Sequence, residues 1–140
     1  MFRQDYLLRL IEQIAAALAR MVGHNRKREY EHAISEASHA WSDVLGVPRE
    51  VVDVVDTPTL AGMLREPDKM RAAAQLLVEE ARAVAGKGDP LGGGTRYRRA
   101  LELVLEARAI DPTDADDAMV LELSREVPPN MLDARYRSRA

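Results

Sequence analysis

Apolar residues recur every three or four positions along most of the chain, a spacing that predicts amphipathic helices. The clearest example covers residues 2–22, where the apolar side chains fall on one arc at about 100° per residue. Arg9, Glu12 and Arg20 fall on the opposite side of this helix. Gly23 is its expected end, because glycine readily takes the left-handed conformation that closes a helix. The apolar arc is so wide that one partner helix need not fill it.

The same periodicity predicts four further long helices. They cover about residues 26–45, 68–85, 96–110 and 114–127. Gly46 and Pro48 end the first of these helices, and Asp111-Pro112 ends the third, because proline cannot continue a helix.

The remaining segments are shorter or less regular. Residues 48–67 are predicted to form an irregular helical connection between two hairpins. Within it, Thr57 followed by Pro58 is typical of a helix start with Thr57 as the N-cap. The glycines of residues 86–94 indicate the only flexible linker of the chain. Residues 128–140 are polar and are expected to form a C-terminal tail.

The fold class that follows is all-α, with about five to seven helices arranged as antiparallel hairpins. No segment alternates between apolar and polar residues for long enough to predict a strand. The expected single domain covers residues 1–127, with hairpins at about 3–45 and 68–111 and a capping helix at 114–127.

Composition agrees with a small globular domain. The 140 residues are 46% hydrophobic and 31% charged, which separates the chain from disordered sequences. The net charge of −3 gives no sign of a nucleic-acid partner. The absence of cysteine excludes disulfides, thiolate metal sites and cysteine nucleophiles. Charged residues interrupt every apolar run, so neither a signal peptide nor a membrane span is expected, and the default location is the cytoplasm.

Two segments repeat a short pattern of one tyrosine followed by small and aliphatic residues. The first contains Tyr30, Ala33, Ile34 and Ala40, and the second contains Tyr97, Ala100, Leu101 and Ala107. Ala33 and Ala100 are expected to lie at close helix–helix contacts, and Trp41, beside Ala40 on the apolar face, is expected to be buried. The copies are 67 residues apart, close to twice the roughly 34-residue unit of a tetratricopeptide repeat (TPR). The run Ala107-Arg108-Ala109-Ile110-Asp111-Pro112 continues the second copy and resembles the second helix of a TPR.

The chain therefore resembles TPR proteins, well over residues 70–112 and less well over residues 7–45. The first copy lacks the Asp-Pro stop, and residues 48–67 replace a regular middle repeat. Residues 1–13 also resemble the start of an uncharacterised bacterial family of short TPR-like proteins, which implies a bacterial source. The resemblance implies a non-catalytic protein–protein interaction module or adaptor without a cofactor.

TPR proteins bind a protein or peptide partner on a concave surface that their first helices mainly line. By resemblance, the candidate partner-binding residues are the polar positions Arg9, Gln13, Arg20, Gln75, Glu79 and Arg82. A self-assembling structural homo-oligomer, most simply a homodimer, is the alternative, because terminal helices of a short array leave apolar flanks uncovered. A metal-binding or enzymatic role is the least favoured interpretation.

Two polar clusters could carry chemistry. The stripe His32, Glu36, His39 and Asp43 has metal-ligand side chains, but its two histidines are about 10 Å apart along a helix, too far to share one ion. A solvated helix face is the simpler interpretation, and no metal site is predicted.

A Gly-rich run, residues 92–95, precedes Arg96, Arg98 and Arg99 and could cradle a phosphate at a helix start. However, the P-loop spacing and its preceding strand are absent, so a flexible turn is the simpler interpretation. Two short basic clusters elsewhere are surrounded by acidic residues, so a nucleic-acid role is not expected.

Overall fold

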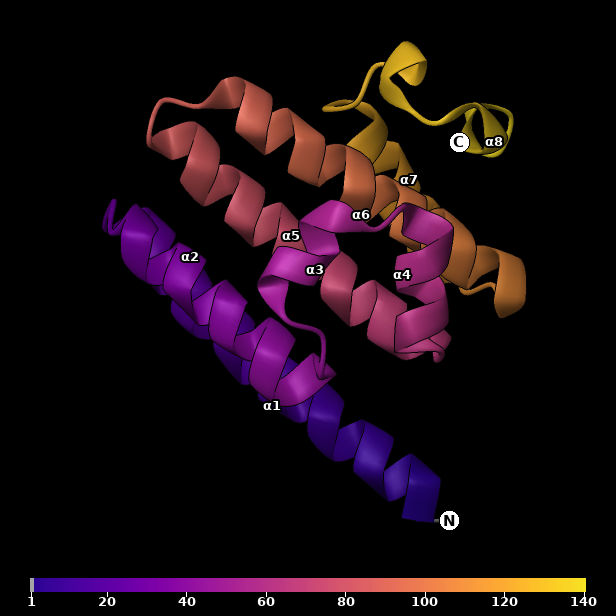
Figure 1. The fold of residues 1–140 in the computed structure, drawn as a ribbon, viewed down its shortest axis with the longest axis horizontal. Coiled ribbons are helices and arrows are strands. Elements are labelled where there is room, and N and C mark those ends of the chain that lie inside the picture. Colours follow the sequence, from indigo (N-terminus) through magenta and orange to yellow (C-terminus); the bar gives the residue numbers. More distant parts are fainter. Residues whose placement is uncertain (1) are drawn as a thin grey trace.

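The computed structural model describes residues 2–140, which form helices joined by short turns (Figure 1). The elements in chain order are α1 (Phe2–Arg26), α2 (Tyr30–His39), the π-helical segment η1 (Ala40–Leu45), α3 (Arg49–Val54), α4 (Thr57–Leu64), α5 (Pro67–Gly86), α6 (Pro90–Ile110), α7 (Asp114–Ser124), the 3₁₀ turn η2 (Pro129–Met131) and α8 (Ala134–Arg137). No strand occurs among these residues, and the predicted all-α class is confirmed.

The helix α5 lies at the centre of the fold. It packs against α1, α2 and α6, and it also contacts η1 and α4. Its buried side chains point in nearly all directions, which is typical of a core helix rather than a surface helix. Many of them are small, namely Ala72, Ala73, Ala74, Ala81 and Ala83. Small side chains let neighbouring helices approach closely, so α5 can hold several partners at once.

Both long hairpins turn through the same backbone motif. Arg28 (φ 61°) and Gly88 (φ 102°) take the left-handed conformation after α1 and α5. The following amides, of Glu29 and Asp89, donate to the carbonyl five residues earlier at 2.8 and 3.2 Å. This Schellman-type cap satisfies carbonyls that a helix end otherwise leaves unpaired. The two turns are therefore equivalent in structure, at positions 60 residues apart.

The prediction that the first helix ends at Gly23 is wrong, because α1 continues to Arg26. Glycine inside a helix costs only about 1 kcal/mol relative to alanine, and tertiary contacts can offset that amount. Here Asn25 in the added turn donates to the main-chain carbonyl and the carboxylate of Glu79 on α5, at 3.1 and 3.0 Å. The next helix accordingly begins at Tyr30 instead of near residue 26.

The Gly-rich segment 86–94 is not a flexible linker, contrary to the prediction. Its first glycine ends α5 and its last three lie inside α6, so only residues 87–89 separate the two helices. The side chain of Asp89 caps α6 by accepting from the amide of Gly92 at 2.9 Å, and Pro90 occupies the first helical position. These two start signals outweigh the low helix propensity of the glycines.

The 67-residue repeat does not mark equivalent positions along the two hairpins. Tyr30 is the first residue of α2, whereas Tyr97 lies about two turns inside α6. Equivalent positions in the two turns, Arg28 and Gly88, are 60 residues apart. The two copies of the tyrosine pattern are 67 residues apart, so the second copy lies seven residues further along its helix than the first. Because seven residues make two helical turns, the shift keeps the same helix face. Ala33 and Ala100 are accordingly both buried, as predicted.

Residues 48–67, for which the sequence predicts an irregular helical connection, contain the two short helices α3 and α4. The cap of α4 differs from the prediction, because Asp56 and not Thr57 is the N-cap. The Asp56 carboxylate accepts from the amide of Thr59 at 2.9 Å. Thr57 is the first residue of the helix, and its hydroxyl donates to the buried Glu102 of α6 at 2.6 Å.

The C-terminal segment packs on α6 and is part of the fold, although the sequence places it outside the domain. Leu132 and Tyr136 are buried. The amide of Asp133 donates to Glu102 at 3.1 Å, and the Tyr136 hydroxyl donates to Glu106 at 3.2 Å. Burial and the negative charge of Glu106 raise the pKa of Tyr136 well above its ordinary value.

The only tryptophan, Trp41, is completely buried in the same core cluster as Ile14, as the sequence predicts. Replacing Trp41 by Ala is expected to lower the free energy of unfolding by about 3–5 kcal/mol, because a large cavity would remain. Urea unfolding followed by circular dichroism measures this change. Native fluorescence of the unmodified protein peaking at the wavelength of fully solvated tryptophan would contradict the placement.

Two neighbouring glycines of α6 offer a matched pair of substitutions. A Cβ atom at Gly94 would lie 3.8 Å from Met131, so Gly94→Ala is expected to stabilise the protein by about 0.5–1 kcal/mol through the unfolded state. A Cβ at Gly93 would lie 3.1 Å from the carbonyl oxygen of Ala81 and from the Cβ of Ala85 in the central helix. Gly93→Ala is therefore expected to be destabilising. The midpoint of thermal unfolding of both variants tests this difference. Equal stabilisation of the two variants would show that α5 and α6 can move apart.

Candidate functional site

The helix α1 carries two apolar seams that run side by side. Leu10, Ile14, Ala17 and Met21 form the first seam and are buried in the core. The second seam consists of Gln4, Leu8, Ile11, Ala15, Leu18 and Val22. Both seams alternate steps of three and four residues, the heptad spacing with which helices pack alongside one another.

The second seam forms one wall of a groove, and α5 forms the other wall. The groove has a volume of about 580 Å³, and α5 contributes Asp68, Arg71, Ala72 and Gln75 to it. A smaller hollow of about 160 Å³ shares Leu18 and Gln75 with it and extends to Val22 and to Met119 of α7. We call these two adjoining hollows together, from Gln4 to Val22, the α1–α5 groove.

Large apolar side chains are exposed at one end of the α1–α5 groove. The first turns of α1 extend beyond the neighbouring helices (Figure 1). Leu8, which lines the groove, is 61% exposed on this part of the helix, whereas Tyr6, which is 60% exposed, borders the separate hollow on the other side of α1. Contiguous apolar surface beside a hollow is typical of an interaction site in a water-soluble domain, whereas single exposed apolar residues are ordinary.

The charged residues in the α5 wall are held in place by one another. Arg71 donates to Asp116 of α7 at 2.8 and 3.0 Å, to Asp68 at 2.9 Å, and to the carbonyl oxygen of Asp111. The hydrogen bond from Arg71 lowers the pKa of Asp116, and the same bond raises the pKa of Arg71. Because these groups satisfy each other, the wall needs no polar contact from an occupant.

Of the predicted partner-binding residues, three lie at the α1–α5 groove. Gln75 and Glu79 line it. Arg82 forms an ion pair with Glu79 and lies 3.7 Å from Glu122 of α7 at the groove's edge.

The other three predicted residues lie on the opposite side of α1. Arg9 and Gln13 border a separate hollow of about 290 Å³ together with Asp43. Arg20 donates to Glu36 of α2 at 2.8 Å. The six residues therefore do not form the single concave surface that the TPR resemblance implies.

The stripe of His32, Glu36, His39 and Asp43 runs along α2 into η1. Its first histidine stacks on His24 with ring centroids 5.3 Å apart. Within residues 2–140, no three His, Cys, Asp or Glu side chains come close enough together to hold a metal ion.

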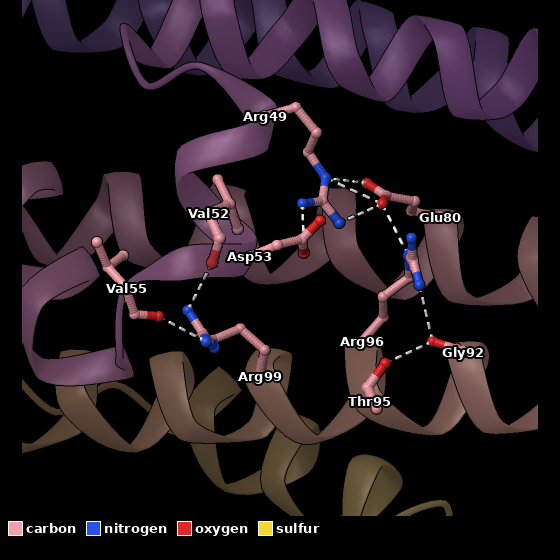
Figure 2. A network of polar contacts seen from close by, with 9 residues as sticks. All are labelled: Arg49, Val52, Asp53, Val55, Glu80, Gly92, Thr95, Arg96 and Arg99. Carbon is pink, nitrogen blue, oxygen red and sulfur yellow. Dashed lines mark hydrogen bonds and ion pairs between the residues drawn. The ribbon is translucent and has the colours of Figure 1, made fainter.

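A buried ion-pair network occupies the face of α5 that carries Glu80 (Figure 2). Glu80 is 2% exposed and accepts from Arg49 of α3 at 3.0 Å and from Arg96 of α6 at 2.8 Å. Burial opposes the charge of Arg49, but its hydrogen bonds with Glu80 and Asp53 outweigh burial and raise its pKa. The network therefore joins α3, α5 and α6 through one carboxylate.

The arginines considered as a phosphate cradle, namely Arg96 of this network and the neighbouring Arg98 and Arg99, line a hollow of about 250 Å³. Arg99 donates to the carbonyls of Val52 and Val55 at 3.1 and 2.8 Å and so caps the end of α3 (Figure 2). Burial and repulsion from Arg98 lower the pKa of Arg99. Arg98 in turn pairs with Glu102 at 3.1 Å. Each guanidinium is used within the protein, so this cluster holds α3 and α4 in place.

Comparisons with protein-family models, with curated proteins and with solved structures find no match for the chain. None of the helices in the described part of the chain, residues 2–140, is long and apolar enough to cross a membrane. The feature of this fold that is best suited to bind another molecule is the α1–α5 groove.

The partner-binding residues predicted from the sequence are polar, and they do not include the apolar residues that line the groove, namely Leu8, Ile11, Ala15 and Leu18. The signal that could identify them is the wide apolar arc of residues 2–22. That arc contains two heptad seams, whereas one neighbouring helix covers only one.

Glu80→Gln tests whether the network is structural. The change leaves Arg49 and Arg96 without their shared carboxylate and is expected to cost about 3–5 kcal/mol of stability, as for other broken buried ion pairs. Asp53→Asn is the control, since its pair with Arg49 is exposed and is worth less than about 1 kcal/mol. Urea unfolding measures both variants, and equal effects would contradict a structural role for the burial of Glu80.

Proposed function

We propose that the protein is a non-catalytic protein–protein interaction module of TPR-like type that holds a helix of a partner protein in the α1–α5 groove. The observation that carries the proposal is the second heptad seam of α1, which faces a groove and not a neighbouring helix. The antiparallel pairs α1–α2 and α5–α6, which contact each other through α5, support the TPR-like description.

The spacing of the seam favours a helix as the occupant over an extended peptide. A seam with three- and four-residue steps matches a second helix that crosses α1 at roughly 20°. From Gln4 to Val22 the groove follows α1 for about 27 Å, at 1.5 Å per residue. A partner helix of about five turns would fill that length.

The walls of the groove favour binding by apolar contact. Leu8, Ile11 and Leu18 would lose their remaining exposure to water, which is the main driving force for association. Arg71 and Glu79 already have hydrogen-bond partners within the protein. An occupant would therefore bury few polar groups that lack a hydrogen-bond partner. Burying such groups is what usually weakens an interface.

Self-assembly is the second candidate function. A homodimer could cover Tyr6 and Leu8, which are both well exposed on the projecting end of α1. Light scattering over a range of concentrations distinguishes the two candidates, because a strict monomer at high micromolar concentration excludes a homodimer as the working state.

The proposal predicts where a partner can be crosslinked. A photo-reactive amino acid at Ala15, an exposed position in the groove, is expected to capture another protein in cells that express this one naturally. The same amino acid at the exposed Glu50 of α3 is the control position. Ile11→Ser is expected to abolish the Ala15 adduct, because it removes apolar contact from the groove wall.

Three results would change the interpretation. Adducts only with a second copy of the chain would support self-assembly instead. Equal adducts at Ala15 and Glu50 would show no specific surface, and the absence of any adduct at Ala15 would contradict the proposal.

A further inference from the structure

The charges beside the α1–α5 groove restrict what can occupy it. At about 100° per residue, Asp5 and Glu12 lie roughly 40–60° from the seam residues Leu8 and Ala15, on the flank that faces away from the core. Both acidic residues are exposed. They are seven residues apart, so they take the same flanking position in successive heptads.

The opposite wall is acidic as well. Asp68 and Glu79 line the groove from α5, and Glu122 of α7 is exposed near its far end. The two cations of this wall, Arg71 and Arg82, are each shared between two carboxylates. Carboxylates therefore outnumber guanidinium groups on both sides of the groove, although Arg26 follows one turn beyond Val22.

The same charges argue against a second copy of α1 as the occupant. An α1 helix that entered the groove with its own free seam would bring its outer flank, with Asp5 and Glu12, towards the α5 wall. Like charges would then face each other across the interface at Asp68 and Glu79. Such pairings select against the wrong partner.

We infer that the occupant of the α1–α5 groove is a basic amphipathic helix of another protein. This inference rests on the proposed function and adds the chemistry of the partner. Apolar side chains at three- and four-residue steps would fill the groove, and Lys or Arg on both flanks would reach Asp5 and Glu12 on one wall and Asp68 on the other. Long basic side chains suit this position, because their methylene stems can cover apolar walls while their charges stay in water.

Two synthetic helical peptides test the charge preference. Each has about 18 residues with leucines in the heptad seam, and they differ only in carrying lysine or glutamate at the flanking positions. Fluorescence anisotropy with the full chain is expected to show binding of the lysine peptide at least about tenfold tighter than the glutamate peptide. Raising the salt to roughly 0.5 M is expected to reduce that difference, because exposed charges are then screened.

Three variants of the protein locate the effect. Ala15→Trp adds bulk in the groove at an exposed position and is expected to abolish binding of the lysine peptide. The double change Asp5→Lys with Glu12→Lys is expected to weaken binding of the lysine peptide and to strengthen binding of the glutamate peptide. Glu50→Lys on α3 makes the same acid-to-lysine change at one position away from the groove, half of the charge change of the double variant, and is expected to have no effect.

The outcomes separate the inference from the proposed function. Equal binding of the two peptides, or a preference for glutamate, overturns the basic partner but leaves a helix-binding groove. A dimer that Ala15→Trp dissociates also overturns it, because a second copy then fills the groove. If neither peptide binds the folded protein, or if binding survives Ala15→Trp, both the inference and the proposed function fail.

Discussion

The close approach of α1, α2 and α6 to the central helix α5 determines where the long helices lie. Most side chains of α5 from Met70 to Val84 are buried, and alanines separate the larger ones. Interiors are packed as tightly as organic crystals, so small side chains set the distance between helix axes. Through these alanines α5 contacts α1, α2 and α6 at once. The first seam of α1 is fully buried in this core, whereas the second seam, of which Ile11 and Leu18 are partly buried, lies beside a groove.

Buried carboxylates attach the shorter segments to this helical centre. Glu80 joins α3 to α5 and α6, Glu102 joins α4 and the C-terminal segment to α6, and Asp116 joins α7 to α5. A buried charge is costly unless its hydrogen bonds are satisfied, so each segment has few alternative positions once its arginine, threonine or amide is paired. The segments that follow α2 and α6 are thus held by specific polar contacts in addition to the apolar side chains that they bury, such as Leu60, Leu64 and Leu132.

The sequence predicts the helical class and the burial of Trp41, Ala33 and Ala100, because all three follow from a period of three to four residues. The same period explains the error in the repeat: a shift of seven residues preserves the helix face and conceals the wrong position along the axis. The turn at Arg28 could not be predicted, since an arginine in the left-handed conformation carries no glycine signal. The pairing of Glu80 depends on three separate helices, and no local pattern encodes it. The groove residues are visible in the sequence only as an unusually wide apolar arc.

The contacts between α1 and α5 differ in kind from those elsewhere in the fold. Ion pairs and hydrogen bonds join the two helices near their ends, where Arg3 pairs with Glu66 and Asn25 donates to Glu79. Between these points the exposed surface is mainly the apolar seam of α1. Covering the Glu80 side of α5 would require a partner to displace a satisfied ionic network, whereas covering the α1 seam removes apolar surface from water and leaves every existing hydrogen bond in place. The difference in cost between these two surfaces is the physical reason why the proposed partner-binding site is the α1–α5 groove and not the cluster of arginines beside Glu80.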